Sequence, residues 1–232
     1  MLKSFPNHFR ACVIGATGAI GAAFVAQLQA DPRCDTVLAL HRKSSPPIDM
    51  NDERSIEAAA EALQSSGPFH LIIHAAGVLH SDDFMPEKKL GDLHFAQMQT
   101  TFMVNTFGPA LVLRYFSKLL DKQRGVLALL SAKVGSIEDN RLGGWYSYRA
   151  SKAALNMMIK TAAIEIKRTQ PNSVIVALHP GTVTSALSQP FRGAEIGRPA
   201  LQAASEMLQV LDALQAEDTA SFVTYQGQRL PW

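Results

Sequence analysis

The chain has 232 residues, which is enough for one large α/β domain or two small ones. Hydrophobic residues make up 47% of it and charged residues 18%, and the formal net charge of +2 gives no reason to expect nucleic acid or a membrane surface as a partner. No signal peptide is visible, no apolar run approaches the roughly 20 residues that span a bilayer, and the seven histidines lack metal-ligand spacing. We therefore expect a cytoplasmic protein without a bound metal, in which Cys12 and Cys34 remain reduced thiols.

The first apolar segment, Arg10 to Ile14, runs into a glycine turn (15–21) and then into a helical stretch from Ala22 to Ala30. A strand, a glycine turn and a helix in this order are typical of the opening of a dinucleotide-binding unit. Glycines let the backbone approach a phosphate, and the free N–H groups of the helix N-terminus attract its charge. The spacing Gly-x-x-Gly-x-x-Gly also suits a tight turn that packs small residues, so the turn alone leaves both interpretations open.

The second predicted strand, 36–40, ends in His41-Arg42-Lys43-Ser44. An acid at this place would hold the ribose hydroxyls of NAD, whereas an arginine accommodates the 2′-phosphate of NADP. The chain has two adjacent cations there and no acid, which favours NADP over NAD; the alternative is a solvated basic loop. Residues 48–50 are expected to form a short third strand, followed by a helix from Glu53 to Leu63.

The fourth predicted strand, 69–74, is apolar almost throughout, as expected for a strand covered on both faces, and continues into Ala75-Ala76-Gly77. These small residues would let a cofactor lie across the strand end. A polar stretch (81–92) precedes a long helical region, 94–120, in which Pro109 can introduce a kink. Asn105, a polar residue in this apolar helix, is either a structural hydrogen-bonding residue or part of a site.

The fifth predicted strand, 125–130, ends at Ser131, and the glycine pair 143–144 then leads into a long helix without proline before Pro171. On that helix Tyr148 and Lys152 share one face because they are four residues apart. An ammonium group within about 4–6 Å lowers the pKa of a phenol and makes it a better acid near neutral pH. Tyr146 is the competing phenol, but it lies six residues before Lys152.

The tyrosine helix is apolar on nearly every side, so we expect one side to meet the sheet and the other a second subunit. A sixth strand (174–179) is closed by Pro180-Gly181-Thr182, a turn-rich loop follows from Ser185 to Pro199, and a helix (200–214) and a last strand (220–224) complete the chain. Strands and helices alternate, which predicts one Rossmann-type α/β domain over 1–232: a doubly wound, seven-stranded, mostly parallel sheet flanked by helices.

Five features occur in one order: the glycine turn 15–21, Ala75-Ala76-Gly77, Asn105, Tyr148-x-x-x-Lys152 and Pro180-Gly181. Together they strongly resemble the short-chain dehydrogenase/reductase family, and the resemblance covers essentially the whole chain. Within that family, residues 135–137, 139–140, 143–152 and 227–232 are similar to the C-factor (C-signal) branch.

The resemblance implies a role for each matching position. Tyr148 would give a proton to a carbonyl oxygen or take one in reverse, Lys152 would lower its pKa and hold the nicotinamide ribose, and Asn105 would anchor a water in a proton relay. The implied cofactor is NADP(H), with NAD(H) as the alternative; Asp49 would meet its adenine and Thr182 its carboxamide. The full implied set is Gly15, Thr17, Gly18, Ile20, Gly21, His41, Arg42, Asp49, Met50, Ala75, Ala76, Gly77, Lys152, Pro180, Gly181 and Thr182.

The sequence departs from the family pattern in three places. The middle glycine of the turn is shifted to Gly18, and the Asn-Asn-Ala-Gly motif appears as His74-Ala75-Ala76-Gly77. The third departure is at the catalytic serine, because Ser131-Ala132-Lys133-Val134-Gly135 places Ala132 at that position. Losing a donor to the developing alkoxide costs on the order of 2.7–4 kcal/mol by analogy with an oxyanion hole. Ser131 or Ser136 could replace it, with Ser131 slightly ahead because it ends the strand; a disabled site is the other possibility.

Two functions follow. The first is an NADP(H)-dependent oxidoreductase that moves a hydride between the nicotinamide and a small carbonyl or alcohol substrate, with Tyr148 as proton donor or acceptor. The second is a C-factor-like signalling or regulatory protein that binds the cofactor with weak or no turnover. By position the segment 185–199 would be a substrate lid, whose Leu187, Pro190 and Phe191 indicate an apolar substrate. The family also implies a homodimer or homotetramer.

Overall fold

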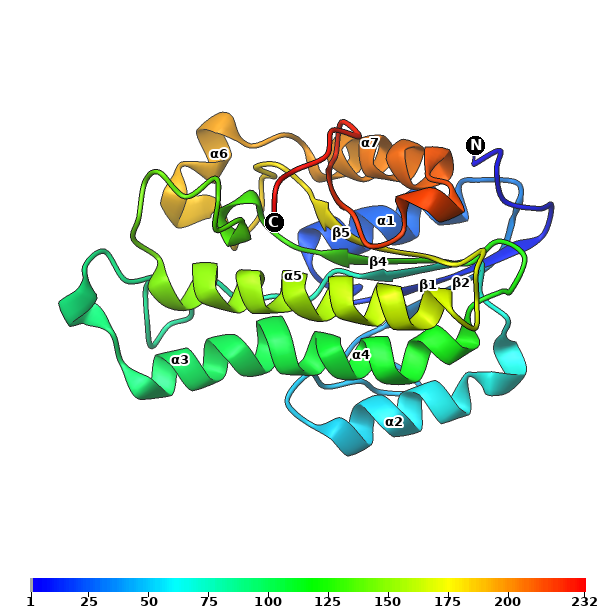
Figure 1. Ribbon diagram of the computed structural model, residues 1–232, viewed down its shortest axis with the longest axis horizontal. Helices are drawn as coiled ribbons and strands as arrows, with labels where there is room; N and C mark the ends of the chain where they lie inside the picture. Colours follow the sequence, from blue (N-terminus) through cyan, green and yellow to red (C-terminus); the bar gives the residue numbers. More distant parts are fainter. Residues whose placement is uncertain (1) are drawn as a thin grey trace.

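The computed structural model describes residues 2–232, which form a three-layered α/β domain with the sheet in the middle layer (Figure 1). The strands are β1 (Phe9–Ile14), β2 (Cys34–Leu40), β3 (Leu71–His74), β4 (Val126–Leu130), β5 (Val174–His179) and β6 (Phe222–Thr224). The α-helices are α1 (Ala19–Gln29), α2 (Glu53–Ala62), α3 (Phe95–Phe102), α4 (Gly108–Phe116), α5 (Tyr146–Lys167), α6 (Gly193–Ile196) and α7 (Ala200–Ala213).

The sheet is parallel throughout and has the order β2-β1-β3-β4-β5-β6. The order reverses direction between β1 and β3, and the carboxyl ends of the strands at such a switch point are where ligands bind in open α/β sheets. Ile14 at the end of β1 lies beside both Leu40 of β2 and His74 of β3. The segments after these three strands therefore leave the sheet at one level, and they are the glycine turn, the basic loop and Ala75-Ala76-Gly77.

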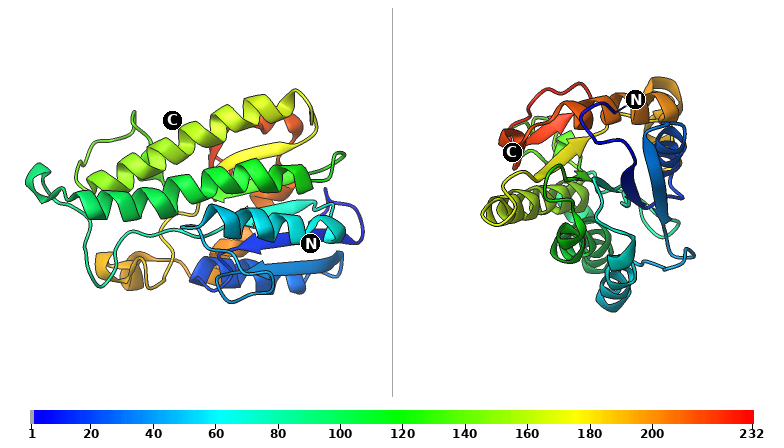
Figure 2. Two further views of the ribbon diagram at one scale, coloured as in Figure 1. Left: turned by 90° about the horizontal axis from the view of Figure 1, so that it is seen from below. Right: turned by 90° about the vertical axis from the view of Figure 1, so that its right-hand side faces the viewer.

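The two faces of the sheet are covered by different helices, as the end view in Figure 2 shows. Side chains alternate along each strand: Val126 and Ala128 of β4 belong to the core under α1 and α7, whereas Leu127 and Leu129 belong to the core under α2, α4 and α5. Strands buried on both faces have few polar positions, which explains the apolar runs in the sequence. Within residues 2–232 no helix combines the length and the apolar character that crossing a membrane requires.

The expected seventh strand is absent from the described residues, because 48–50 lies outside the regular secondary structure. Pro46 and Pro47 precede it and have no N–H groups for a strand ladder, and the Ile48 N–H donates to the carbonyl of His41 instead. Ile48 and Met50 are nonetheless buried in the core. Ile48 and Met50 are therefore apolar because they pack into the core, although they pair with no strand of the described chain. The sheet has six strands.

The long helical region is present, and Figure 2 shows α3 and α4 following one another as a continuous rod. Residues Met103–Phe107 between them form a turn of π-helix directly before Gly108 and Pro109. Pro109 lacks the N–H that would bond to the carbonyl of Asn105 in a regular α-helix, and a π-turn is one way to absorb that loss. Pro109 therefore accounts for the wider π-helical turn that contains Asn105.

Candidate active site

The glycine turn has the geometry of a phosphate-binding cradle. Gly15 has φ of +84°, and a Cβ atom on it would lie 2.6 Å from the backbone nitrogen of Ala76. A Cβ atom on Gly21 would lie 2.2 Å from the carbonyl oxygen of Gly15, so a side chain is excluded at both places. No side chain caps the N-terminus of α1 and no acid lies in its first turn. Free N–H groups at an uncapped helix end suit a pyrophosphate, so the residues present fit a dinucleotide.

The basic loop after β2 holds exposed cations beside this cradle. Arg42 and Lys43 are exposed, His41 is half-buried, and neither Arg42 nor Lys43 forms an ion pair within residues 2–232. The next acid after the loop is Asp49, whose carboxylate accepts hydrogen bonds from the backbone and side chain of Asn51. Two uncommitted cations at the end of β2 suit a ligand with an additional phosphate better than one with free ribose hydroxyls.

Asn105 and Lys152 meet at Gly77, where the chain has left β3. A Cβ atom on Gly77 would lie 3.4 Å from Asn105 Oδ1 and 3.6 Å from Lys152 Nζ. Lys152 is buried and its Nζ donates to the carbonyl of Leu130 at the end of β4, at 3.0 Å. The same Nζ lies 5.9 Å from the centre of the Tyr148 ring. Four segments that are distant in sequence are thereby brought together at the carboxyl edge of the sheet.

Burial changes the acid-base properties of this pair in opposite directions. It lowers the pKa of Lys152 to about 8 and raises that of Tyr148 to about 12. The expected lowering of the Tyr148 pKa is thus wrong for this arrangement, because loss of solvent around the phenol is the dominant cause. At neutral pH the phenol keeps its proton and the lysine its charge, which is the state that a proton donor to a carbonyl requires.

His74 and His179, which end β3 and β5, are neutral at the same pH. Burial, reinforced by Lys152, lowers the pKa of His74 to about 3, and burial with Lys133 and Arg198 lowers that of His179 to about 4. His74 Nε2 lies 3.2 Å from the sulfur of Met50. The Met50 side chain is therefore a core group, and only its backbone is left to meet a cofactor.

The two serines considered as replacements for the missing catalytic serine are both committed elsewhere. Ser131 is buried and its hydroxyl donates to Asn156 Oδ1 of α5 at 2.6 Å. Ser136 donates to the carbonyl of Trp232 and accepts from the N–H of Asp139. Odd-numbered residues of β4 face α4 and α5, so Ser131 continues that face into the core. Ala132 is partly exposed at the strand end and carries no donor.

The segment after β5 is held by Arg198, a residue that the sequence interpretation missed. Its guanidinium donates to the carbonyl of Pro180, stacks on Tyr225 with the Cζ atom 3.5 Å from the ring centre, and pairs with Glu206. Gly181 has φ of +69°, and a Cβ atom there would lie 2.7 Å from the Tyr225 ring. Pro180 and Gly181 thus have a defined backbone path, and Thr182 after them is exposed. Nothing about an arginine before a proline marks this role in the sequence.

A row of three aromatic rings, Trp145, Phe191 and His80, extends from Tyr148, and of the three only Trp145 contacts the Tyr148 ring directly. Trp145 lies 6.2 Å from Tyr148 and 4.9 Å from Phe191 of the 185–199 segment, between ring centres. His80, on the segment after β3, lies 5.8 Å from Phe191, and its Nε2 is 3.2 Å from the carbonyl of Ala186. The 185–199 segment therefore touches both the helix that carries Tyr148 and the segment that follows Gly77.

Another missed residue is Glu87, whose buried carboxylate contacts the first turn of α5. It lies in a polar stretch (81–92) where acids, lysines and proline are expected to be solvated, so composition gave no sign of it. Its partner Ser147, next to Tyr148, is a small polar residue at a helix start.

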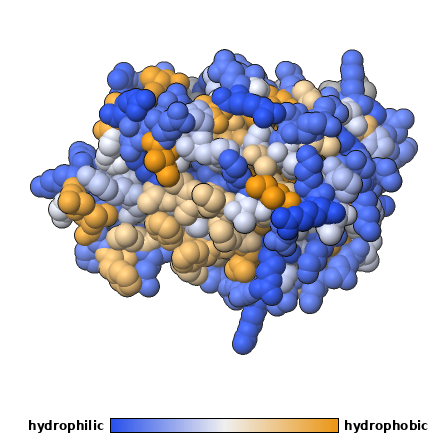
Figure 3. Space-filling model, viewed as in Figure 1, coloured by the Kyte–Doolittle hydropathy of each residue, from blue (hydrophilic) through white to orange (hydrophobic). Residues whose placement is uncertain are grey.

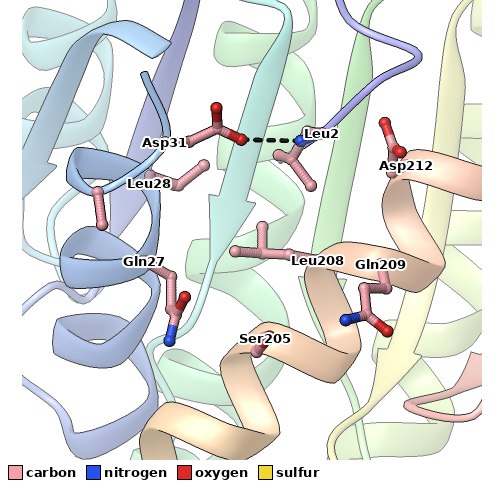
Figure 4. A pocket seen from close by; sticks show the side chains of 9 residues that line it. Leu2, Gln27, Leu28, Asp31, Ser205, Leu208, Gln209 and Asp212 are labelled. Carbon is pink, nitrogen blue, oxygen red and sulfur yellow. Dashed lines mark hydrogen bonds between the residues drawn. The ribbon is translucent and has the colours of Figure 1, made fainter. Parts of the chain in front are cut away.

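A hollow of about 210 Å³ lies elsewhere, between α1 and α7 (Figure 4). It is lined near the ends of both helices by Leu28, Asp31 and Asp212, and these aspartates accept hydrogen bonds from the backbone of residues 2–4. These helix ends lie at the edge of the sheet where the strands begin. Tyr148 of α5 lies at the opposite edge, beyond the carboxyl ends of the strands. The hollow is thus separate from the candidate site and belongs to the packing of the N-terminal segment.

The sheet order, glycine cradle and Tyr-x-x-x-Lys pair define a short-chain dehydrogenase, and residues 10–195 match the family described as short chain dehydrogenase. The chain belongs to this family of oxidoreductases. It is 36% identical over 171 residues to C-signal from Myxococcus xanthus, which covers 72% of this chain and 95% of that protein. It is 30% identical over 188 residues to 1-hydroxy-2-glutathionyl-2-methyl-3-butene dehydrogenase from Rhodococcus sp. (strain AD45), covering 81% and 79%. Among solved structures, NADPH-bound carbonyl reductase from chicken fatty liver superposes with a TM-score of 0.82 at 25% identity, covering 98% and 96%.

Proposed function

We propose that this chain is an NADP(H)-dependent carbonyl reductase in which Tyr148 is the proton donor. The observation that carries the proposal is the meeting of Lys152 and Asn105 at Gly77, with the Lys152 ammonium 5.9 Å from the Tyr148 ring. The likeness to a carbonyl reductase with bound NADPH and to a bacterial dehydrogenase supports the same reaction class. A nicotinamide cofactor in this site would supply the hydride.

The protein residues divide the remaining work. The phenol of Tyr148 releases its proton to the substrate oxygen as the carbonyl carbon is reduced, and the charge of Lys152 stabilises the phenolate left behind. Asn105 holds the backbone next to Gly77. The glycine cradle would hold the pyrophosphate through Gly15, Thr17, Gly18, Ile20 and Gly21. Arg42 would hold the 2′-phosphate, His41 and Asp49 would contact the adenosine, and Thr182 would contact the carboxamide.

The segment 185–199 is the proposed substrate lid. Its two ends are joined, because Arg198 donates from its N–H to the carbonyl of Thr182 and accepts from the N–H of Thr184, both at 3.0 Å. Phe191 of this segment packs on Trp145, whose ring lies next to Tyr148. A covering made of aromatic rings excludes water and favours a carbonyl substrate with a flat or apolar substituent.

The chain is also proposed to form a homodimer or homotetramer. Figure 3 shows apolar side chains gathered over α3–α4 and α5. The exposed apolar residues of these helices are Phe95, Met98, Phe107, Tyr146, Met157, Met158 and Ile164. A contiguous apolar face of this kind marks a protein interface in a globular protein. Light scattering of the wild type and of Met157→Lys tests it, since a charge in the interface should leave a monomer.

A second candidate function is a C-signal-like signalling or regulatory protein that binds the cofactor but turns over little. Two observations favour it: Ala132 removes a donor from the family's catalytic set, and the chain is 36% identical to C-signal. Under this alternative the cradle binds NADP(H) but no carbonyl is reduced at an appreciable rate.

The deciding experiment combines fluorescence titration with NADPH and NADH and a turnover assay on aromatic and aliphatic aldehydes and ketones. We expect tighter binding of NADPH and measurable reduction. Tyr148→Phe should abolish turnover while leaving NADPH affinity unchanged. Tyr146→Phe is the matched control, because it removes an exposed phenol from the same helix turn. Equal activity in Tyr148→Phe contradicts the assignment. Binding without turnover in the wild type favours the signalling protein, and no binding at all contradicts both.

A further inference from the structure

Glu87 reaches across 60 positions of sequence to the first turn of the helix that carries Tyr148. Its Oε2 accepts from the N–H of Ser147 at 3.1 Å, and its Oε1 accepts from the Ser147 hydroxyl. Its backbone carbonyl also accepts from the N–H of Trp145. One residue from the segment between β3 and α3 therefore makes three hydrogen bonds to residues 145–147.

The start of α5 needs such a partner because it has no cap of its own. Trp145, the N-cap residue, has left-handed backbone angles (φ 52°, ψ 44°) and gives no side-chain hydrogen bond to the helix. The first N–H groups of a helix lack partners within it, and the positive end of the helix dipole attracts an anion. The Glu87 side chain supplies both, at 2% exposure and without an ion pair within residues 2–232.

The segment that carries Glu87 is itself held in place. Asp92 Oδ2 accepts from the N–H groups of Lys88 and Lys89, and Gln97 of α3 donates to the carbonyl of Met85. The carboxylate is thus presented from a braced loop. A buried carboxylate is costly unless hydrogen bonds satisfy it. Both oxygens of Glu87 accept from Ser147, so the burial of this group is tied to the position of the first turn of α5.

We propose that Glu87 is a positioning residue for Tyr148: by fixing the first turn of α5 it directs the phenol hydroxyl to the substrate oxygen. This inference rests on the proposed reductase function. Ser147 and Tyr148 are consecutive, so any rotation or fraying of that turn displaces the phenol directly. Misplacement of a reacting group by about 1 Å can cost on the order of 10² in rate. The loop after β3 thereby sets the position of the Tyr148 phenol without contacting the substrate itself.

Three variants separate positioning from stability. Glu87→Ala removes the two side-chain bonds, Ser147→Ala removes only the hydroxyl bond, and Glu87→Gln keeps acceptor and shape while losing the charge. Asp82→Asn, an exposed acid of the same loop, is the matched control. Each variant is measured well below its melting temperature for kcat, KM and NADPH affinity. The resonance of ¹³Cζ-labelled Tyr148, assigned with Tyr148→Phe, provides a readout that does not need turnover.

We expect kcat of Glu87→Ala to fall on the order of 10-fold to 100-fold, with NADPH affinity within about twofold of wild type and a shifted Tyr148 resonance. Glu87→Gln should recover most of the rate, and Asp82→Asn should match wild type. If Glu87→Ala does not fold, Ser147→Ala should show the smaller change in the same direction. Unchanged kcat and resonance in the folded variants overturn the proposal, as does a loss of kcat without any change at Tyr148. If the wild type reduces no carbonyl, the reductase function fails separately and the resonance alone decides whether Glu87 positions Tyr148.

Discussion

Asn105 and Val78 form a reciprocal pair of hydrogen bonds, in which Asn105 Oδ1 accepts from the Val78 N–H and Asn105 Nδ2 donates to the Val78 carbonyl, both at 2.8 Å. The amide thus bonds the chain after Gly77 as a neighbouring strand would. A third bond joins Nδ2 to the Ser151 hydroxyl of α5 at 3.2 Å. The π-turn at 103–107 places this side chain, at 0% exposure, between β3 and the tyrosine helix. The Asn105 side chain thus has the structural role that the sequence left open, and it has it at the place where the candidate site is assembled.

Replacing Asn105 should therefore destabilise the fold as well as the site. Asn105→Ala removes the partner of the part-buried N–H and carbonyl of Val78, and a group left unpaired costs up to roughly 1–3 kcal/mol when it is fully buried. Asn105→Asp keeps the acceptor but turns a carboxylate oxygen towards the Val78 carbonyl, so its melting temperature should also lie below that of the wild type. Thermal unfolding of the three proteins checks both losses. An alanine variant as stable as the wild type contradicts the structural role.

The pH dependence of reduction should follow Lys152 and not Tyr148. Lys152, with a pKa lowered to about 8 by burial, is charged below that pH and neutral above it, whereas Tyr148, raised to about 12, keeps its proton throughout. We expect kcat/KM to be flat near pH 7 and to fall as the pH rises through about 8. The measurement is a profile from pH 6 to 10 at saturating NADPH, in which a rate that stays flat up to pH 10 contradicts the assignment to Lys152.

The same depressed pKa has a consequence for stability. Between about 8 and the ordinary value of 10.5 the unfolded chain binds the proton that folded Lys152 has released. Stability rises with pH wherever the unfolded state binds more protons. The contribution of Lys152 to the free energy of unfolding should therefore increase as the pH rises from about 8 to 10.5. Denaturant unfolding of the wild type and of Lys152→Met at pH 7 and 10 tests it, because the methionine variant should lack this increment.

Restoring the missing serine should raise activity. Ala132→Ser places a hydroxyl at the partly exposed end of β4, and a further donor to the developing alkoxide is worth on the order of 10²–10³ in kcat. Ser131→Ala is the companion variant: because its hydroxyl is committed to Asn156, it should lose stability and keep kcat. A large loss of kcat in folded Ser131→Ala, with no gain in Ala132→Ser, shows that Ser131 is the donor after all.

Cofactor choice should depend on Arg42. Removing a charge-assisted contact to a phosphate costs about 1.5–3 kcal/mol, which is roughly 10-fold to 100-fold in affinity. Arg42→Glu should weaken NADPH binding by that factor and leave NADH binding unchanged or improved. Arg54→Glu, an exposed arginine at the start of α2, is the charge-matched control. Fluorescence titration decides, and equal losses for both cofactors contradict a contact with the 2′-phosphate.

The sequence by itself determined the order of strands and helices, the glycine cradle and the pairing of Tyr148 with Lys152. These features are local: apolar runs specify strands buried on both faces, glycines mark where a Cβ atom would collide, and a four-residue spacing places two side chains on one helix face. The false third strand shows the limit of this reasoning. Ile48 and Met50 are apolar because they enter the core, and periodicity alone does not distinguish that from strand pairing.

Tertiary structure decided everything that depends on groups distant in sequence. Burial raises the pKa of Tyr148, the amide of Asn105 forms hydrogen bonds with Val78, and the Ser131 hydroxyl donates to Asn156. Glu87 reaches α5 from a loop whose composition predicted only solvent. Desolvation and hydrogen bonding act over a few ångströms, and only the fold determines which distant residues come that close.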